Sequence, residues 1–498
     1  PCIVADRESG KVLVLSCAGN VSFPSGTRNN HQNIARFYSE DNGETWSAPV
    51  DIAESIYSQF DVREDGPVRA MFIGSGKIIQ SETVKVNDYY RLYCAALVKI
   101  NDGTNTNFVF YSDDFGGSWH VLGTINDRPA SGGNEPKCEE LPDGTVILSS
   151  RKSGGRFFNI FTFDDDTYTT GKWGEVANST SAYDGSNQGT NGEIYKVKAI
   201  RKSDGQICDV MLQSVPAGPG RSNVTVYYKE MDYTIAYTPA TFAADWKEGK
   251  QVSQKGSAYS TMHLQADGRI GFFFEEEPSE YCMVYIPYTL EDLTDDKYTL
   301  YTVSSKIGQH GIGTFYASEA MQIPEGVEAY VATEQPQING GENASGYLRL
   351  TELNDIIPAK TGVVLKGEAM TYNFIPSISY GAKVEGNMLV GFEAADNKDD
   401  SYSEVAYPTD GSVNYVLAVE NEVAAFYRQE AGFKVFNNKA YLNVPVNAAV
   451  IHLDDDETTS IDAVDTEAQN AVIYDLSGRR TKKVSKGVYI VNGKKVIR

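Results

Sequence analysis

The sequence has no long apolar run and comparatively few basic residues. Lys and Arg number 44 against 67 Asp and Glu, so the 498-residue chain carries a formal net charge of −23. A membrane span needs about 20 consecutive apolar residues, so none is expected here. Nucleic acid is not an expected partner either, because neutralising phosphates requires a basic surface. A site for an anionic ligand would have to be locally positive against this acidic background.

Cysteine is also scarce. None of the six cysteines shows CxxC spacing, so a zinc site is not expected, and such a sparse set does not indicate a disulfide framework. Several lie within apolar runs, where a buried free thiol is the simplest interpretation. We expect no metal and no organic cofactor. The cysteines are Cys2, Cys17, Cys94, Cys138, Cys208 and Cys282.

Long amphipathic helical periodicity is absent, and short β-rich runs alternate with Gly, Asn, Asp and Pro turns. Many short strands at regular spacing predict an all-β sandwich, barrel or propeller. At this length the chain is expected to contain two or three domains. The clearest runs are residues 12–16, 34–39, 90–99, 108–112, 145–150, 157–163, 224–229 and 271–274.

A turn sequence occurs twice and favours the propeller among these folds. Residues 39–46 read Ser-Glu-Asp-Asn-Gly-Glu-Thr-Trp, and residues 111–119 read Tyr-Ser-Asp-Asp-Phe-Gly-Gly-Ser-Trp. Asp41 and Asp114 are expected to accept hydrogen bonds from their own turns, while the Gly supplies a permissive φ and the Trp packs under the turn. At roughly 40–50 residues per blade, about six blades would fit before residue 300.

Composition changes near Thr302. From there to about residue 456 the chain contains no Cys and no Trp, and it reads as further β-structure. We therefore predict a six-bladed β-propeller over residues 1–300 and an accessory β-domain, a sandwich, over residues 301–456. Residues 457–498 are predicted to form a polar linker and a short C-terminal β tail.

The stretch 134–151 is the strongest candidate for a functional segment. It predicts two strands, residues 137–141 and 145–151, joined by a Pro-Asp-Gly turn. Asp-Gly between apolar runs is a strong hairpin signal, because Gly takes the positive φ of a tight turn. This hairpin would hold Glu135 at one end and Arg151 at the other.

Several segments together, in this order, resemble the exo-α-sialidase family over about residues 1–300. The two turns match the family's Asp boxes. The next match combines Asn134-Glu135-Pro136, the Glu-Leu-Pro-Asp-Gly segment at residues 140–144, and Arg151. The last two matches are Gly-Arg221-Ser-Asn at residues 220–223, and Ser-Ala-Tyr259-Ser at residues 257–260 followed by Asp-Gly-Arg-Ile-Gly at residues 267–271. The resemblance implies a propeller that hydrolyses terminal α-linked sialic acids with retention. It implies that Tyr259 is the nucleophile, that Glu135 is its general base, and that Arg151 and Arg221 bind the sugar carboxylate.

The chemistry of the sugar gives these residue types a physical reason. Sialic acid carries a carboxylate on its anomeric carbon, and arginines bind that group by bidentate, charge-assisted hydrogen bonds. A carboxylate nucleophile would be repelled there, whereas a Tyr hydroxyl deprotonated by a Glu is not. Taken singly, Tyr259, Glu135, Arg151 and Arg221 also fit packing, capping or surface roles. Taken together, they favour a site.

The chain departs from the family pattern in two places. The family's third carboxylate-binding Arg would lie upstream of Pro1, so we expect the N-terminus to be incomplete. The family's acid/base Asp belongs to the loop before the first Asp box, but residues 20–33 contain no Asp or Glu. Arg28 and His31 are the candidates for that space. The alternatives are therefore a sialic-acid-binding lectin or an acid-deficient pseudoenzyme, a hydrolase of a related keto-sugar acid, or a structural adhesin.

Two weaker candidates complete the site. Gln188 resembles a family Gln-Gly-Ser/Thr segment near the pocket, and Glu275 is a strand-end carboxylate that could orient an Arg or simply be solvated. Residues 487–495 are similar to the C-terminal sorting modules of secreted bacterial proteins. We expect a monomer that acts on sialylated glycans or glycoproteins and is secreted, periplasmic or at the bacterial cell surface, with its signal peptide outside this sequence.

Overall fold

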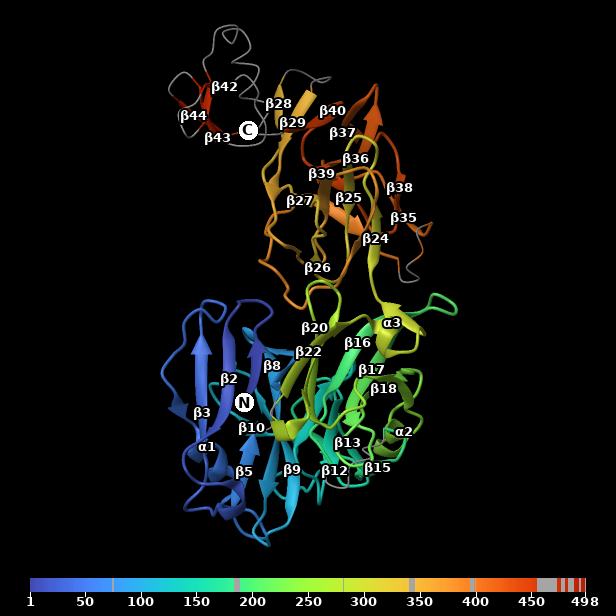
Figure 1. Cartoon of the computed structure of the whole chain (residues 1–498). Coiled ribbons are helices and arrows are strands. Elements are labelled where there is room, and N and C mark those ends of the chain that lie inside the picture. The colour runs from blue at the N-terminus through green and yellow to red at the C-terminus, as the bar shows by residue number, and fades with distance from the viewer. Residues whose placement is uncertain are drawn as a thin grey trace. The chain divides into compact units, whose positions relative to one another are not determined.

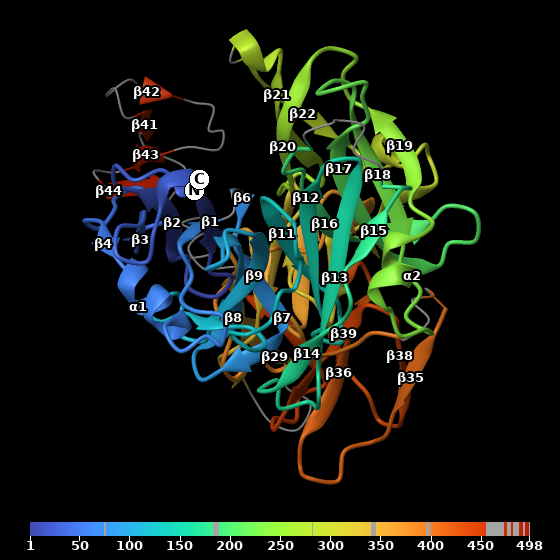
Figure 2. The same ribbon diagram turned by 90° about the horizontal axis from the view of Figure 1, so that it is seen from below.

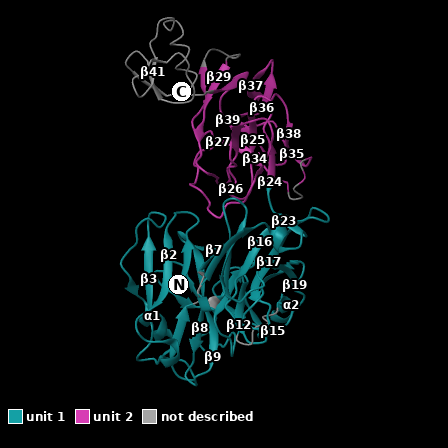
Figure 3. Cartoon of the chain, in the orientation of Figure 1, with its two compact units in different colours: residues 1–302 teal, residues 303–498 magenta. Residues whose placement is uncertain are grey.

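The computed structural model describes the chain except residues 74–75, 183–188, 281, 340–344, 395–397, 399, 455–472, 476–479, 482–487, 492–493 and 498. The chain forms two compact units, residues 1–302 and 303–498 (Figure 3). Regular structure is almost entirely β, as predicted (Figure 1), and the longest described helices have five residues. No helix in the described part is long and apolar enough to cross a membrane.

The described residues of the first unit form five sheets. The first contains β1 (Cys2–Ala5), β2 (Val12–Ala18), β3 (Asn33–Ser39), β4 (Val50–Asp51) and β6 (Gly76–Lys77). The second contains β5 (Ala70–Ile73), β7 (Ile79–Val86), β8 (Tyr89–Lys99), β9 (Asn105–Ser112) and β10 (His120–Val121). The third contains β11 (Pro136–Glu140), β12 (Val146–Lys152), β13 (Gly155–Phe163), β14 (Gly171–Trp173) and β15 (Ala177–Ser179).

The remaining two sheets follow in chain order. The fourth contains β16 (Ile194–Arg201), β17 (Ile207–Pro216), β18 (Val224–Glu230), β19 (Lys247–Gln251) and β23 (Tyr298–Leu300). The fifth contains β20 (Ser257–Leu264), β21 (Ile270–Glu276) and β22 (Cys282–Tyr288). The helices are α1 (Ala53–Tyr57), α2 (Pro239–Ala243) and α3 (Leu290–Leu293), with 3₁₀ turns η1 (Phe23–Ser25), η2 (Ser58–Phe60) and η3 (Pro278–Glu280).

The five sheets succeed one another around the first unit in the order of the sequence (Figure 2). Each packs against the next, through β2 and β5, β8 and β11, β11 and β16, and β17 and β20. Within a sheet, consecutive strands are mostly antiparallel neighbours, the up-and-down order that propeller blades use. The count of six blades stays a prediction, because the described part of this unit contains five sheets.

The strands predicted from short β-rich runs are confirmed. The runs at residues 12–16, 90–99, 157–163 and 224–229, for example, lie within β2, β8, β13 and β18. β8 is buried along most of its length, because its alternate residues pack into two different apolar cores, Cys94 and Ala96 into one and Tyr93 and Ala95 into the other. A strand covered on both faces reads as a continuous apolar run rather than an alternating one.

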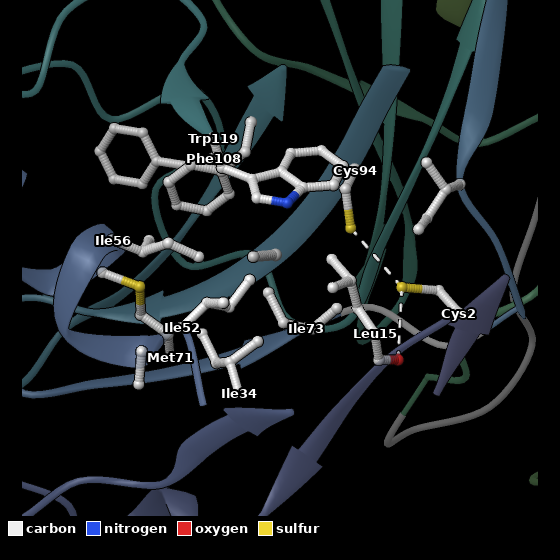
Figure 4. Close-up of a cluster of buried hydrophobic side chains, with 14 of the residues drawn as sticks. Cys2, Leu15, Ile34, Ile52, Ile56, Met71, Ile73, Cys94, Phe108 and Trp119 are labelled. Atoms are coloured by element: carbon white, nitrogen blue, oxygen red, sulfur yellow. Dashed lines mark hydrogen bonds between the residues drawn. The ribbon is translucent and has the colours of Figure 1, made fainter. Parts of the chain in front are cut away.

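A large apolar core lies between the first two sheets (Figure 4). Leu15 from β2, Cys94 from β8 and Trp119 are each at most 4% exposed there. The thiols of Cys2 and Cys94 are 3.6 Å apart in this core, and all six cysteines are free. Side-chain packing in this core therefore joins two sheets that share no backbone hydrogen-bond ladder.

The two repeated turns make matching hydrogen bonds. Asp41 Oδ1 accepts from the Thr45 amide at 2.8 Å, and Asp114 Oδ1 accepts from the Ser118 amide at the same distance. In each turn the Gly after the Asp has a positive φ, of 91° and 83°. The Trp residues differ. Trp119 is buried, whereas Trp46 is 44% exposed and donates its indole N–H to its own turn, so only the second turn covers its Trp as predicted.

The second unit contains sheets of different size. The largest, in spatial order, has seven strands: β28 (Gln337–Asn339), β29 (Ser345–Arg349), β40 (Val450–Asp454), β37 (Val423–Arg428), β36 (Val413–Glu420), β39 (Lys439–Val444) and β34 (Leu389–Phe392). A four-stranded sheet contains β25 (Ile312–Phe315), β32 (Val363–Gly367), β27 (Val327–Val331) and β30 (Thr351–Glu352). Three pairs are β24 (Val303–Lys306) with β33 (Thr371–Phe374), β26 (Met321–Gln322) with β31 (Ile356–Ile357), and β35 (Tyr402–Val405) with β38 (Phe433–Phe436).

The C-terminal tail forms a small separate sheet. Its described strands are β41 (Ile473–Asp475), β42 (Arg480–Thr481), β43 (Val488–Val491) and β44 (Lys494–Ile497), and β43 pairs antiparallel with β44. The sorting role of this tail and the accessory role of the preceding β-structure stay predictions.

Candidate active site

Glu135 and Arg151 lie side by side at the open end of the β11–β12 hairpin. The Arg151 amide donates to the Glu135 carbonyl at 3.2 Å, and the Asn134 amide donates to the Arg151 carbonyl at 3.0 Å. The opposite end of the hairpin is the Pro-Asp-Gly turn. There Gly144 has a φ of +81°, and its amide donates to the Leu141 carbonyl at 2.9 Å. The predicted hairpin is therefore confirmed, and it fixes the two side chains as neighbours.

Tyr259 reaches this pair from the fifth sheet. Its hydroxyl lies 3.3 Å from Glu135 Oε1, to which it donates, and it accepts from Arg151 Nη1 at 3.1 Å. Arg151 Nη1 also donates to Glu135 Oε2. The register of β20 with β21 shifts between Ser257 and Ser260, and a bulge of this kind redirects a side chain. Three side chains far apart in sequence thus form one hydrogen-bonded group.

Arg221 is the fourth member of the group and lies near the ring of Tyr259. Its guanidinium carbon lies 5.7 Å from the centre of the Tyr259 ring, and that of Arg151 lies 6.0 Å from it. Arg221 Nη2 donates to the Gly189 carbonyl at 3.5 Å, while its Nε is buried without a hydrogen-bond partner in the described structure. Two guanidinium groups therefore surround one phenol and one carboxylate, which makes this spot locally positive in an acidic chain.

The surroundings keep the phenol protonated at rest. Burial raises the pKa of Tyr259 and the Glu135 carboxylate raises it further, although Arg151 and Arg221 oppose this. Burial lowers the pKa of Arg151, but Glu135 and Tyr259 raise it and the net shift is upward. The group can thus hold a neutral hydroxyl beside a proton acceptor, with fixed positive charge nearby.

Two further candidates are placed differently. Glu275 Oε2 accepts from the backbone amide of Tyr259 at 3.3 Å, so its described contact is with the strand that carries Tyr259 rather than with an arginine. Gln188 lies outside the described residues.

A cavity of about 650 Å³ opens beside the hairpin and has Glu135 in its wall. That volume lies within the usual range for small-molecule sites. Its lining mixes apolar side chains with backbone and amide groups, and Tyr259, Arg151 and Arg221 are not among the lining residues. The lining residues are Phe23, Pro24, Phe72, Leu97, Lys99, Gly103, Asn105, Gly132, Asn134 and Glu135.

Arg28 and His31 belong to a separate cluster. Arg28 donates to both oxygens of Glu54, at 3.0 and 2.7 Å, and to both oxygens of Asp61, at 2.6 and 2.8 Å. The His31 ring stacks on Tyr57 at 3.8 Å between centroids, and its Nε2 is 3.8 Å from Glu54. Among the contacts of the described residues, none joins Arg28 or His31 to the group around the phenol.

This cluster supplies carboxylates that sequence reasoning missed, because they follow the loop by more than 20 residues. Hydrogen bonds from Arg28 lower the pKa of Glu54 and of Asp61. Both acids are thus ionised near neutral pH, which makes them poor proton donors. A second cavity of about 370 Å³ contains Arg28 in its wall and shares Pro24 and Lys99 with the first.

Arg156 is another residue that the sequence did not single out. It pairs with Arg151 across β12 and β13, and its side chain is completely buried. It donates to Ser149 Oγ at 2.7 Å and to the carbonyls of Thr190 and Asn191 at 3.1 and 2.8 Å. Arg156 therefore holds the segment after residue 189, whose carbonyl contacts Arg221. The β12–β13 pairing that sets Arg156 opposite Arg151 could have drawn attention to Arg156, but it does not reveal that the side chain is buried.

One group of possible metal ligands occurs in the described part of the chain. Glu277, Glu280 and Cys282 bring ligand atoms within 4.8 Å of one another. Acidic groups of this kind are common at surfaces without an ion, and none of the three contacts the phenol group.

No family model matches the chain. A sialidase of Paraclostridium sordellii is 24% identical over 274 residues, which cover 54% of this chain and 63% of that protein. A sialidase of Micromonospora viridifaciens is 26% identical over 298 residues, covering 55% and 39%. The resemblance to the exo-sialidases is confirmed. The chain spans less than two thirds of the length of these sialidases.

Solved sialidase structures are also similar to the chain. The intramolecular trans-sialidase of Ruminococcus gnavus, in complex with oseltamivir carboxylate, is 20% identical, with a TM-score of 0.41 and coverage of 53% of this chain and 52% of that one. The Trypanosoma rangeli sialidase is 13% identical, with a TM-score of 0.41 and coverage of 87% and 77%.

Proposed function

We propose that this chain is an exo-α-sialidase, a retaining glycoside hydrolase that removes terminal sialic acids from glycans. The observation that carries the proposal is the three-way contact of Tyr259, Glu135 and Arg151, with Arg221 against the same ring. A phenol next to a carboxylate and two arginines matches a substrate that brings its own negative charge to the reacting carbon.

Binding begins with the sugar carboxylate. The Arg221 guanidinium carbon lies 5.7 Å from the Tyr259 ring centre, so its terminal nitrogens can donate to an anion that binds beside the phenol. Arg151 Nη1 contacts the Tyr259 hydroxyl, so this second guanidinium can donate to the same anion. Charge-assisted bonds of this type fix orientation as well as affinity.

Attack requires the phenol to lose its proton as the bond to the anomeric carbon forms. The proton passes from Tyr259 Oη to Glu135 Oε1, 3.3 Å away, and the phenolate oxygen attacks the anomeric carbon. Arg151 and Arg221 stabilise the phenolate character that develops. As this bond forms, the bond from the anomeric carbon to the glycan oxygen breaks, and the departing oxygen takes a proton from solvent. A water molecule then attacks the anomeric carbon from the face that the glycan left, opposite Tyr259, and releases a proton to solvent. The bond to Tyr259 Oη breaks, and Glu135 returns its proton to that oxygen.

Among the described residues, the family's carboxylic-acid proton donor for the departing glycan oxygen has no counterpart. The loop of residues 20–33 has no Asp or Glu, and the two acids held against it by Arg28 are ionised. General acid catalysis is typically worth 10²–10⁴-fold. We therefore propose slow turnover of natural sialosides and faster turnover of aryl sialosides, whose leaving groups need little protonation.

The test compares an aryl sialoside with sialyl-lactose. Wild type is expected to release sialic acid from the aryl substrate, and Tyr259→Phe to lower kcat on the order of 10³-fold or more. The variant should still bind a dehydrated sialic-acid analogue, because its arginines remain. Tyr285→Phe, on β22 of the same sheet, is the matched control and should keep full activity. Undiminished turnover by Tyr259→Phe would exclude this tyrosine as the nucleophile.

The second candidate function is binding without turnover, as in a sialic-acid lectin. The ionised state of Glu54 and Asp61 favours it, because neither acid can protonate a leaving group. A lectin would bind the dehydrated analogue and cleave neither substrate. Cleavage of the aryl substrate alone would indicate an acid-deficient enzyme, and absence of binding would indicate a structural adhesin.

The proposal extends to the setting of the enzyme. A glycan hydrolase meets its substrates outside the cytoplasm, and the Gly-Val-Tyr-Ile-Val strand of the tail supports export to the cell surface or beyond. Fractionation of producing cells with an antibody to the chain tests this. Recovery of the whole chain in the cytoplasm would contradict it.

A further inference from the structure

The two strands that carry the proposed base and nucleophile belong to different sheets. Glu135 precedes β11 of the third sheet, and Tyr259 lies on β20 of the fifth. Strands within one sheet keep their spacing through a ladder of hydrogen bonds. β11 and β20 share no such ladder, so the distance between the Glu135 carboxylate and the Tyr259 hydroxyl depends on other contacts, one of which is Arg151 Nη1, bonded to both groups.

A single carboxylate from the intervening fourth sheet touches both strands. Glu193 directly precedes β16, and its Oε2 lies 3.3 Å from Lys137 Nζ. The same oxygen accepts a hydrogen bond from Thr261 Oγ1 at 2.7 Å. The side chains of Lys137 and Glu193 are 3% and 0% exposed, so this contact is not screened by solvent.

Lys137 and Thr261 hold matching places on the two strands. Lys137 follows Glu135 by two residues, and Thr261 follows Tyr259 by two. The bridge therefore lies two residues along the chain from Glu135 on one segment and two residues from Tyr259 on the other.

The carboxylate that makes this bridge is itself held firmly. The Glu193 amide donates to Ser214 Oγ at 2.8 Å, and that hydroxyl lies 2.8 Å from Ser260 Oγ of β20. Immediately before Glu193, the carbonyls of Asn191 and Gly192 accept from the buried Arg156 guanidinium at 2.8 and 3.3 Å. Both the backbone and the side chain of Glu193 are thus fixed relative to the third and fifth sheets.

We propose that Glu193, through Lys137 and Thr261, is the positioning residue that sets the distance between the base Glu135 and the nucleophile Tyr259. The roles of those two residues rest on the proposed function, but the spacing itself does not. A buried ion pair often adds little net stability, so its value here is geometric. A displacement of about 1 Å between reacting groups can cost on the order of 100-fold in rate.

The choice of test variant follows from burial. Removing Lys137 would leave an ionised carboxylate buried with its Oε1 already unpaired in the described structure, and this would destabilise the fold. Thr261→Val removes only the hydroxyl and keeps the shape. Thr261→Ser restores the hydroxyl. Thr314→Val, in the second unit, makes the same chemical change where it should not matter.

Kinetics on the aryl sialoside give the first readout. Thr261→Val is expected to lower kcat on the order of 10-fold with KM within about twofold, because binding arginines are untouched and only the attack geometry changes. Thr261→Ser should return kcat to within about twofold of wild type, and Thr314→Val should not change it. Unchanged kcat in Thr261→Val would overturn the inference.

Crystal structures of wild type and Thr261→Val give a readout that does not depend on turnover. The distance from Tyr259 Oη to Glu135 Oε1 is expected to lengthen by about 0.5 Å or more in the variant. An unchanged distance would overturn the positioning role even in an active enzyme. A wild-type chain that cleaves no sialoside would instead overturn the proposed function, and the distance would still decide the inference.

Discussion

At the scale of single residues, the candidate site is defined by one carboxylate and two guanidinium groups placed around a phenol. The proposed nucleophile, Tyr259, has a hydroxyl that is neutral at rest, and Glu135 is the one carboxylate whose oxygens contact that hydroxyl among the described residues. The guanidinium groups of Arg151 and Arg221, 6.0 and 5.7 Å from the ring centre, offset the negative charge of this carboxylate. A second carboxylate beside the phenol would repel an acidic sugar, so the arrangement suits an anionic substrate better than a neutral one.

Arg221→Lys tests the anion-binding role at this scale. Lysine keeps the charge but loses the planar fork, so bidentate recognition of a carboxylate is lost. We expect binding of the dehydrated sialic-acid analogue to weaken about 10- to 100-fold, which corresponds to about 1.4–2.8 kcal/mol. Isothermal titration calorimetry measures this change in the dissociation constant. Arg201→Lys, at a surface arginine paired with Asp204 and Glu230, is the control, and equal affinities for the two variants would contradict the role.

The sequence alone could place two residues side by side where one local motif contains both. Glu135 and Arg151 could be placed together because one hairpin joins them, and Tyr259 could be added through the family resemblance. Arg156 and Glu193 were missed, because nothing local distinguishes a buried charge from an exposed one. Loop carbonyls far along the chain hold Arg156, and Lys137 and Thr261, which contact Glu193, lie on other sheets. Burial of a charge is decided by which strands meet, and that is a property of the tertiary fold.

At the scale of elements, the two repeated turns show how the same local sequence can meet different surroundings. Both turns make the same aspartate-to-amide bond, since the bond lies within the turn itself. Trp119 is nevertheless buried in the core and Trp46 is exposed, because burial depends on the neighbouring sheet. The strands and turns were accordingly predictable from periodicity and turn chemistry, but their packing was not.

Asp114→Asn tests what the turn contributes to stability. Burial raises the pKa of Asp114, but hydrogen bonds from Ser118 and Ser112 outweigh it, so the folded-state pKa is lowered. A carboxyl whose folded pKa is lowered contributes stability above its unfolded pKa of about 3.9, and that contribution is lost as pH falls through the folded pKa. We expect the variant to lose about 1 kcal/mol at pH 7 and the difference to shrink below about pH 4.

Urea unfolding of both proteins across this pH range measures the difference. Asp88→Asn is the control, because Asp88 is exposed and its carboxylate makes no hydrogen bond among those of the described residues. A difference that stays constant from pH 7 to pH 3, or one that the control reproduces, would contradict a specific role for the turn carboxylate.

At the scale of the whole molecule, the chain returns to an earlier sheet before it leaves the first unit. β23 pairs with the end of β16, so residues 298–300 add an edge strand to the fourth sheet, although they follow the strands of the fifth sheet in the sequence. Tyr298 is 9% exposed and donates its hydroxyl to Glu230 at 2.6 Å, and Tyr301 is 2% exposed. The boundary of the first unit after Thr302 therefore includes a strand that the composition change alone did not reveal.

Two shortened chains test whether β23 belongs to the active unit. A chain ending after Thr302 keeps β23 and every proposed site residue, so it should fold, cleave the aryl sialoside like the full chain, and unfold within about 2 °C of the corresponding transition. A chain ending after Asp296 loses the burial of Tyr298, Leu300 and Tyr301, and we expect its Tm to fall by about 5 °C or more. Scanning calorimetry compares them. Equal Tm values for the two would show that β23 is dispensable, and failure of the longer chain to fold would show that residues after 302 are needed to complete the first unit.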